Sequence, residues 1–394
     1  MPWSVAPLRT GRGWVLAPDP GSLRGRWSAL LRAGDEEQRA ALFRPSRART
    51  PHTAVAPLPG VPAPRTARLR DETGGCPEPV PVLHGPYDQQ WLLPDNRLLD
   101  AARPELWRVR DEHQICLVEA AADPRLPGAA LAFTALLPDG WSPAGRPGRI
   151  RPLYRRRGGL EPNIAPGLLP HLASVLDRPV SAEDLLAWIA ATSGEGHEVP
   201  FTSDPALWER GVELGRRALW LHTRGARCGT GERTGKPRMP GGRRPYVRSP
   251  LALGPGMEEL SYDEEEQSLY VGESGRVAPV ERAAWEYEAG GVRVVENWFA
   301  ARAATGERGT LSALRPREWP QEWTSELLEL LTILTLLSEL EEERAAVREG
   351  LRGTELPAST LREAGILPPP RWSRSPASVL DLQEEGPDGQ LPLL

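Results

Sequence analysis

The side chains best suited to chemistry in this sequence are arginines gathered in two segments. Residues 144–157 hold six arginines and no acid, and residues 216–248 hold ten basic residues against Glu232. A guanidinium keeps its charge and presents its N–H groups in a planar fork, which pairs with phosphate oxygens or with the edge of guanine. These residue types predict a surface that contacts nucleic acid.

The two segments concentrate charge against the background of the whole chain. They carry +15 within 47 residues, whereas the complete chain carries -5, which leaves -20 on the remaining 347 residues. A globally basic DNA-binding protein is therefore excluded, but a locally basic face is not. The alternative is a pair of solvated loops in a protein of biased codon usage, since Lys236 is the only lysine. The candidate DNA contacts are Arg146, Arg149, Arg151, Arg155, Arg156, Arg157, Arg224, Arg227, Arg238, Arg243, Arg244 and Arg248. Among them, Arg151, Arg155, Arg243 and Arg244 are the favoured candidates for reading base edges.

Motifs of catalysis are absent or incomplete. The stretch Gly229–Lys236 resembles a phosphate-binding loop, but Thr230 occupies the place of its first glycine and Pro237 the place of its Ser or Thr. No Asn/Asp-Pro-Pro-aromatic motif, which would hold a flipped adenine, occurs in the chain. The six histidines show no metal-ligand spacing. We expect no catalytic site, no cofactor and no metal on this chain.

The cysteines and the apolar segments indicate the cellular compartment of the protein. Cys76, Cys116 and Cys228 lie far apart and form no disulfide or metal pattern, which favours a reducing cytoplasm. The chain opens without the apolar core of a signal peptide. The most apolar stretch, Leu327–Leu340, is too short to span a bilayer and contains two glutamates. We expect a cytoplasmic protein without a membrane partner.

The elements that must position the arginines follow from apolar periodicity. Strands are expected at Gln114–Ala120, Ala129–Leu137 and Arg149–Arg155, together in one mixed sheet, and at Ser268–Val271 and Gly291–Val295. The expected helices are Leu23–Phe43, Leu168–Leu176, Ala182–Thr192 after a capping box at Ser181, Asp204–His222 capped by Ser203, Asn297–Arg302 and Gln321–Arg348. Residues 223–250 are expected to form a long loop.

This pattern predicts an α+β fold: a mixed-sheet domain with a C-terminal long-helix subdomain. We expect an N-terminal helix and proline-rich connector over residues 1–86 and an α/β core over 87–315. A helical subdomain is expected over 316–370 and a disordered tail over 371–394.

Several short segments resemble one protein family in order along the chain. Tyr87-Asp-Gln-Gln-Trp91 with the following Leu-Leu-Pro-Asp-Asn-Arg-Leu98 is similar to a stretch of the C-terminal specificity region of Type ISP restriction-modification enzymes. Further collinear matches are Leu42–Arg47, Asp71–Pro77, Leu153-Tyr154, Pro162–Gly167, Val199–Pro205, Gly215–His222, Trp285–Phe299 and Trp319–Thr324. The resemblance covers roughly residues 25–370.

The resemblance implies a target-recognition domain that binds double-stranded DNA. In this family such a region is joined to a nuclease, a helicase-like motor and an adenine-N6 methyltransferase. It therefore implies that the methyltransferase, with its S-adenosylmethionine, lies on a partner or on a missing N-terminal half.

Two positions depart from the family pattern. Gln89 stands where an arginine is common, and the segment 192–198 is about twenty residues shorter than in relatives. The shorter segment fits a changed specificity or a decayed module. In the competing interpretation the chain is a scaffold or interaction protein of a defence system that does not bind DNA, with Leu327–Leu340 as its docking surface.

Overall fold

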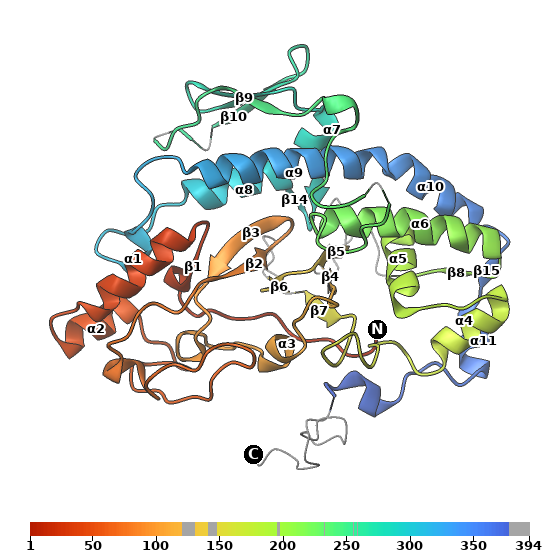
Figure 1. The fold of residues 1–394 in the computed structure, drawn as a ribbon, viewed down its shortest axis with the longest axis horizontal. Coiled ribbons are helices and arrows are strands. Elements are labelled where there is room, and N and C mark those ends of the chain that lie inside the picture. The colour runs from red at the N-terminus through yellow and green to blue at the C-terminus, as the bar shows by residue number, and fades with distance from the viewer. Residues whose placement is uncertain are drawn as a thin grey trace.

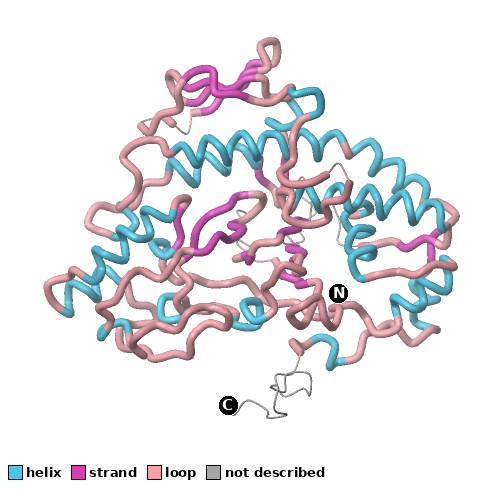
Figure 2. Tube along the Cα trace, in the orientation of Figure 1, coloured by secondary structure: helices cyan, strands magenta, loops and turns pink. Residues whose placement is uncertain are grey.

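The computed structural model describes residues 1–119, 131–140, 148–194, 198–231, 233–254, 256–257 and 259–377. Over these residues, helices and several small sheets form separate groups instead of alternating along one large sheet (Figures 1 and 2). The predicted α+β class is therefore confirmed.

The N-terminal part of the chain contains the sheet that mixes strand directions. Its order is β1–β3–β2–β6, where β2 pairs antiparallel with β3 and parallel with β6. These strands are β1 (Leu16–Ala17), β2 (Val80–His84), β3 (Asp88–Leu92) and β6 (Leu137–Pro138). The helices beside them are α1 (Pro20–Leu31), α2 (Glu36–Phe43) and α3 (Pro104–Arg108). The single helix expected at Leu23–Phe43 is thus two helices, since Asp35 begins a second one by accepting from the N–H of Gln38.

The three strands expected in a mixed sheet form a purely antiparallel one. Its order is β5–β4–β7, with β4 (Cys116–Glu119) between β5 (Leu131–Thr134) and β7 (Arg149–Pro152). The three strands occur where they were predicted, but the prediction that they form a mixed sheet was wrong. The parallel pairing is made instead by β6, at the end of the expected strand Ala129–Leu137, with β2. Ala120, Ala129 and Ala130 lie outside the described residues.

The next three helices follow this sheet in the chain, and the third of them packs against both β5 and the second helix. Helices α4 (Leu168–Leu176) and α5 (Ala182–Thr192) have the predicted bounds, and Ser181 and Asp184 form the predicted capping box. Helix α6 (Pro205–His222) begins after Asp204, whose carboxylate accepts from the N–H groups of Ala206 and Leu207. The predicted cap Ser203 was therefore wrong by one residue.

The long C-terminal helix is interrupted once. Helix α9 (Gln321–Glu339) and α10 (Glu341–Gly350) meet at Leu340. Leu327–Leu340 is buried along its apolar face, and Leu327, Leu334 and Leu340 have no exposed surface. This confirms the buried helix, and it removes the docking surface on which the scaffold interpretation relied.

A four-stranded antiparallel sheet stands apart at the top of Figure 1, beyond α9. Its order is β10–β11–β12–β9. It contains β9 (Tyr246–Ser249), β10 (Leu260–Asp263), β11 (Ser268–Val271) and β12 (Gly275–Ala278). Strand β11 has its predicted bounds, whereas β9 falls within the segment 223–250 that was expected to be a loop.

The remaining elements join these units. The strand expected at Gly291–Val295 shrinks to β14, because Val294 and Val295 are buried in the first turn of α8. These elements are α7 (Arg282–Trp285), β13 (Glu288–Ala289), β14 (Val292–Arg293), α8 (Val294–Ala303), β8 (Phe201–Thr202), β15 (Glu355–Leu356) and α11 (Ala358–Glu363). Residues 371–374 form a 3-10 helix in the first part of the expected tail, and 378–394 lie outside the described residues.

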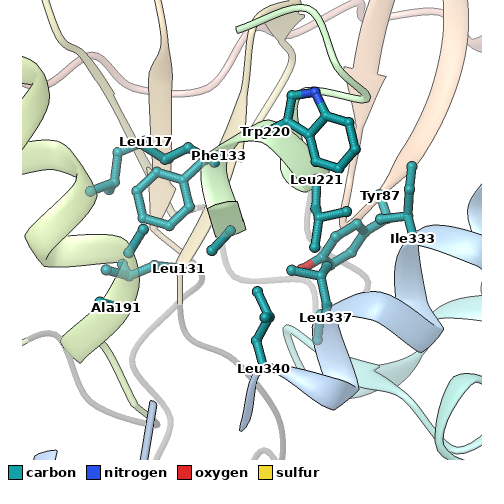
Figure 3. Close-up of a cluster of buried hydrophobic side chains, with 14 of the residues drawn as sticks. Tyr87, Leu117, Leu131, Phe133, Ala191, Trp220, Leu221, Ile333, Leu337 and Leu340 are labelled. Carbon is teal, nitrogen blue, oxygen red and sulfur yellow. The ribbon is translucent and has the colours of Figure 1, made fainter. Parts of the chain in front are cut away.

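Two hydrophobic clusters hold the molecule together. One is built from residues between Trp3 and Ile150 together with Leu311, and the other runs from Tyr87 to Ile366. In the second cluster, a common apolar region is surrounded by Phe133 of β5, Trp220 of α6 and Leu337 of α9 (Figure 3). The sheet β5–β4–β7 and helix α9 thus share one core.

A buried ion-pair network connects strand β3 with helices α8 and α9. Arg302 of α8 donates to Asp88 of β3 at 2.8 Å and to Glu326 of α9 at 2.8 Å. Its guanidinium also lies 3.7 Å from the ring centroid of Trp298. The side chains of Arg302 and Asp88 are 0% and 1% exposed, so this charge is fully removed from water. The network fixes β3 against α8 and α9.

Candidate nucleic-acid interface

The arginines of strand β7 form hydrogen bonds and ion pairs with neighbouring segments of the same chain. Arg149 is exposed and donates to the hydroxyl of Ser4 at 2.9 Å, whereas Arg151 pairs with Glu119 at 2.5 Å and donates to the carbonyl of Met1. Arg149 therefore keeps free donor capacity at the surface, and much of the capacity of Arg151 is already used. Arg146 lies outside the described residues.

The turn that follows β7 separates its three arginines into two roles. Arg155 and Arg156 are buried and share the carboxylate of Glu161, at 2.6 and 2.8 Å. Arg155 also donates to the carbonyls of Trp372 and Ser375, which anchors the C-terminal segment. Arg157 alone is exposed. The first two arginines act as internal tethers, and only the third faces solvent.

Replacing Arg155 with methionine is expected to destabilise the fold rather than to alter the surface charge that a ligand meets. The change leaves two carbonyls and one carboxylate oxygen without their charged donor, which costs about 2 kcal/mol. Urea unfolding measures this loss, and limited proteolysis reports release of residues 371–377. The matched variant Arg157→Met should unfold within about 0.5 kcal/mol of the parent. If Arg155→Met unfolds as the parent does, these contacts are not a stabilising tether.

The segment after α6 turns back onto the body of the protein. Arg224 adopts φ 52° and donates to the carbonyl of Tyr87 at 2.9 Å, beside Glu326 and Glu329. Gly225 follows with φ +83°, and a Cβ there would lie 1.9 Å from the carbonyl oxygen of Gly235. Only glycine fits this approach. The arginines at the start of the segment are therefore held close to the protein.

The later part of the same segment is exposed. Arg238, Arg244 and Arg248 form no ion pair with any acid among the described residues, and Arg243 lies 3.6 Å from Glu281. Arg244 and Arg248 lie 4.8 and 5.4 Å from the ring centroid of Tyr246. We call Arg238, Arg243, Arg244, Tyr246 and Arg248 the arginine–tyrosine face.

The pleat of the protruding sheet explains why these side chains point outward. Val247 of β9 lies opposite Val277 of β12, and the buried Leu269 of β11 follows in the same row. Tyr246 precedes Val247 along the strand and projects from the opposite side. Arg248 lies where the pairing with β12 is irregular, and it is exposed. Tyr246 is 39% exposed although it is a large aromatic residue. An exposed aromatic ring between guanidiniums can stack on a base, and the guanidiniums can pair with phosphate.

The departure at Gln89 lies in a large cleft. This cleft has a volume of about 960 Å³ and runs between α1, β3 and the start of α9. Gln89 and Arg224 line it together with Lys236, which pairs with Glu329 at 2.6 Å. Its charges are therefore largely compensated, unlike those of the arginine–tyrosine face.

Sequence reasoning missed two residues with relevant chemistry. Tyr246 is one, although its position two residues from Arg244 and from Arg248 was a usable signal. Arg110 is the other; it follows α3 in a stretch of mixed charge, and nothing in its local sequence distinguishes it.

The described residues form no metal site, and two of their three thiols are held protonated by burial. No three His, Cys, Asp or Glu side chains within them gather as a metal site. Burial raises the pKa of Cys76 to about 11 and that of Cys116 to about 12, so both thiols stay protonated at neutral pH. Among the described helices, none has the length and apolar character to cross a bilayer.

The fold is α+β, with exposed arginines in strand β9 and in the segment before it. The family model of the Type ISP C-terminal specificity domain matches residues 1–330, and the chain belongs to this family. The resemblance found in the short motifs is thereby confirmed. A comparison with curated proteins finds no match.

Solved structures share this fold at low sequence identity. A DrdV–DNA complex matches 87% of the chain with a TM-score of 0.55 and 14% identity, and 35% of that protein's chain is covered. The Type ISP restriction-modification enzyme LlaBIII bound to DNA matches 90% with a TM-score of 0.56 and 14% identity, over 23% of its chain. A nuclease-deletion mutant of the Type ISP enzyme LlaGI, in complex with a DNA substrate mimic, matches 90% with a TM-score of 0.51 and 13% identity, over 28% of its chain. The chain thus spans between about a quarter and a third of these proteins.

Proposed function

We propose that this chain is the DNA target-recognition module of a Type ISP-like restriction-modification system. One observation carries the proposal: in a specificity-domain fold, strand β9 and the segment before it expose Arg238, Arg244 and Arg248, which form no ion pair with a described acid. Folding has left these guanidiniums in water, where their donors remain available to an anionic partner. Double-stranded DNA is the partner that suits both the charge and the family.

In the proposed mechanism, the arginine–tyrosine face meets the duplex. Arg238, Arg244 and Arg248 neutralise phosphates, and the released counterions favour binding. Arg243 lies beside Gln267 and Glu281, which orient its planar fork. A guanidinium held in this way is suited to bidentate contacts with the O6 and N7 of guanine. Phosphate contacts would position the module, and base contacts would select the site.

The chemistry of modification is assigned to another part of the system. The module would direct a separate adenine-N6 methyltransferase and restriction activity, and S-adenosylmethionine would bind to that partner or to an N-terminal half. This agrees with the missing adenine-pocket motif and with the share of the similar proteins that the chain spans. We place this assembly in the cytoplasm, where the host DNA lies.

The test measures duplex DNA affinity at several salt concentrations. With roughly 4 to 8 phosphate contacts, log affinity should fall with log salt at a slope of about -4 to -7. The variant R238Q/R244Q/R248Q should bind every sequence more weakly, and the slope should lose about 2 to 3 in magnitude. Replacing Arg243 should instead weaken only the preferred site, by about 1–3 kcal/mol.

The matched control removes the same charge from other surfaces. Arg308, Arg352 and Arg362 are exposed and lie outside the arginine–tyrosine face, so R308Q/R352Q/R362Q should keep most of the affinity. Equal losses in both triple variants would show that only net charge matters. A parent that does not bind DNA even at low salt would leave the chain as a scaffold that does not contact DNA.

A further inference from the structure

A small polar pocket lies away from the arginine–tyrosine face. It has a volume of about 370 Å³ and is lined by residues from five separate parts of the chain. Arg110 comes from the segment after α3, Arg157 from the turn after β7, and Arg227 from the segment after α6. Trp107 of α3 and the pair Asp111 and Glu112 complete the relevant lining. Three guanidiniums therefore meet at one concave site.

Two of these arginines have no partner within the described part of the chain. The side chains of Arg110 and Arg157 form no hydrogen bond or ion pair there, although Arg110 is half-buried. Burial lowers the pKa of Arg110, and no acid counters this effect. A guanidinium held partly out of water without a carboxylate is unfavourable unless a ligand supplies the negative charge.

The third arginine is fixed in place without an ion pair to any described acid. Arg227 donates through its Nη atoms to the carbonyls of Asp111 and Ala226, both at 2.9 Å. Its Nε is buried and has no hydrogen-bond acceptor. Burial also lowers the pKa of Arg227, against the weaker opposing effects of Asp111, Glu112 and Cys228. These hydrogen bonds are to neutral carbonyls, so they orient the side chain, and no carboxylate of the described residues forms an ion pair with it.

The two acids of the pocket are occupied elsewhere. The carboxylate of Asp111 accepts from the backbone N–H groups of His113 at 2.9 Å, Gln114 at 3.0 Å and Gly158 at 2.5 Å. The side chain of Glu112 is 81% exposed and lies 3.8 Å from the ring of His113. Neither carboxylate forms an ion pair with the three arginines, so the pocket keeps a positive excess.

The turn that carries Arg157 is shaped for this placement. Gly158 and Gly159 both have positive φ, at +74° and +67°, which side-chain-bearing residues rarely adopt. The reversal lets Glu161 hold Arg155 and Arg156 while Arg157 faces the pocket. One turn thus separates two structural arginines from one that is free to bind.

We infer that this pocket binds a phosphoryl group through Arg110, Arg157 and Arg227. Three guanidiniums from different directions match the oxygens of a tetrahedral oxyanion, which needs several donors at once. The group can be a phosphate of the DNA backbone, which rests on the proposed function, or the phosphate of a small molecule. In the first case the pocket fixes the module on the duplex at a point whose lining shares no residue with the arginine–tyrosine face.

The first experiment uses inorganic phosphate and does not depend on DNA. Calorimetric titration of the full chain, with ionic strength held constant by chloride, should detect phosphate binding. The variant R110M/R157Q should weaken it by at least tenfold, because two of the three unpaired charges are lost. The control R308Q/R352Q removes two exposed arginines that do not line the pocket, and should bind phosphate as the parent does. If the double variant fails to fold, the single variant R157Q serves, since Arg157 is exposed.

The second experiment repeats the salt titration of duplex DNA affinity with the same variants. Loss of one phosphate contact should reduce the magnitude of the slope by about 0.9. Weaker phosphate binding with a reduced slope identifies a DNA phosphate as the ligand. Weaker phosphate binding with an unchanged slope supports the pocket and identifies a small phosphate ester instead.

The results for the parent separate the two proposals. A parent that binds phosphate but no DNA at any salt concentration contradicts the proposed function and leaves the pocket in place. A parent that does not bind phosphate, or a double variant that binds it as tightly as the parent, overturns the pocket whatever the DNA result.

Discussion

Replacing Arg302 with methionine is expected to reduce the free energy of unfolding by about 3–5 kcal/mol. Methionine retains most of the apolar stem but leaves the carboxylate of Asp88, which is 1% exposed, without its buried counter-charge. It also removes the donor to Glu326 and the cation that lies over the ring of Trp298. Because these partners come from β3, α8 and α9, the loss weakens the contact between β3 and the two helices. Urea unfolding followed by tryptophan fluorescence measures it.

The control for this prediction is an arginine with ion pairs at the surface. Arg282 pairs with Glu264 and Glu286, and its side chain is 56% exposed. Arg282→Met should therefore cost only about 0–1 kcal/mol, since exposed ion pairs contribute little. The double variant D88N/R302M should lose clearly less than the two single changes added together, because each single change leaves one buried charge unpaired. A loss under about 1 kcal/mol for Arg302→Met would contradict the role of the network.

Replacing Gly215 with alanine is expected to destabilise the fold by about 3 kcal/mol, at the upper end of the usual cost of overpacking. Gly215 lies in α6 where this helix crosses α5. A Cβ added there would lie 1.7 Å from the carbonyl oxygen of Ala187 and 2.4 Å from its carbonyl carbon. These are backbone atoms of a buried helix, so the two helices must move apart. The change in unfolding free energy should appear together with a lower melting temperature.

The same substitution at a second glycine should have the opposite sign. Gly25 lies within α1, and a Cβ there would meet no atom within 4 Å. Gly25→Ala should stabilise the protein by about 0.5–1 kcal/mol, since alanine loses less backbone entropy in a helix. If both variants gained stability, helix propensity would outweigh the contact between α5 and α6, and the close approach would have no energetic weight.

The parts of the fold that could be predicted are those set by neighbouring residues. Helices α4 and α5 were placed correctly because their apolar spacing and the Ser181 cap are local signals. The cap of α6 was missed by one position, since Ser203 and Asp204 are both good caps and the local sequence does not distinguish them. Val294 and Val295 favour strand locally, yet burial in the core places them in a helix.

Pairing between distant segments could not be predicted in the same way. The parallel contact of β2 with β6 joins residues more than fifty positions apart, and the sequence pattern carries no register for it. The break between α9 and α10 occurs at Leu340, where there is neither proline nor glycine. Helix periodicity continues through such a position, so the pattern indicated a single helix.

In the candidate site, too, local features could be predicted and long-range contacts could not. Charge density along the sequence indicated both arginine segments, but it did not reveal which arginines would meet acids. Arg155 binds the carbonyls of Trp372 and Ser375, more than two hundred residues away. Arg110 gathers with Arg157 and Arg227 only through the tertiary fold. Whether a guanidinium is a tether or a free donor depends on these long-range contacts.

Strand β9 has a second consequence, which concerns solubility. It is the last strand of its sheet and pairs only with β12 among the described strands, so its other edge presents unpaired backbone N–H and C=O groups. Such an edge is a template on which another copy of the chain can add a strand, and charged side chains along it oppose this by mutual repulsion. Arg248 within the strand and Arg244 two residues before it supply that charge. Lysine at these positions would preserve the repulsion, whereas neutral residues would remove it. The strand is therefore under two constraints, one from its ligand and one from its own copies.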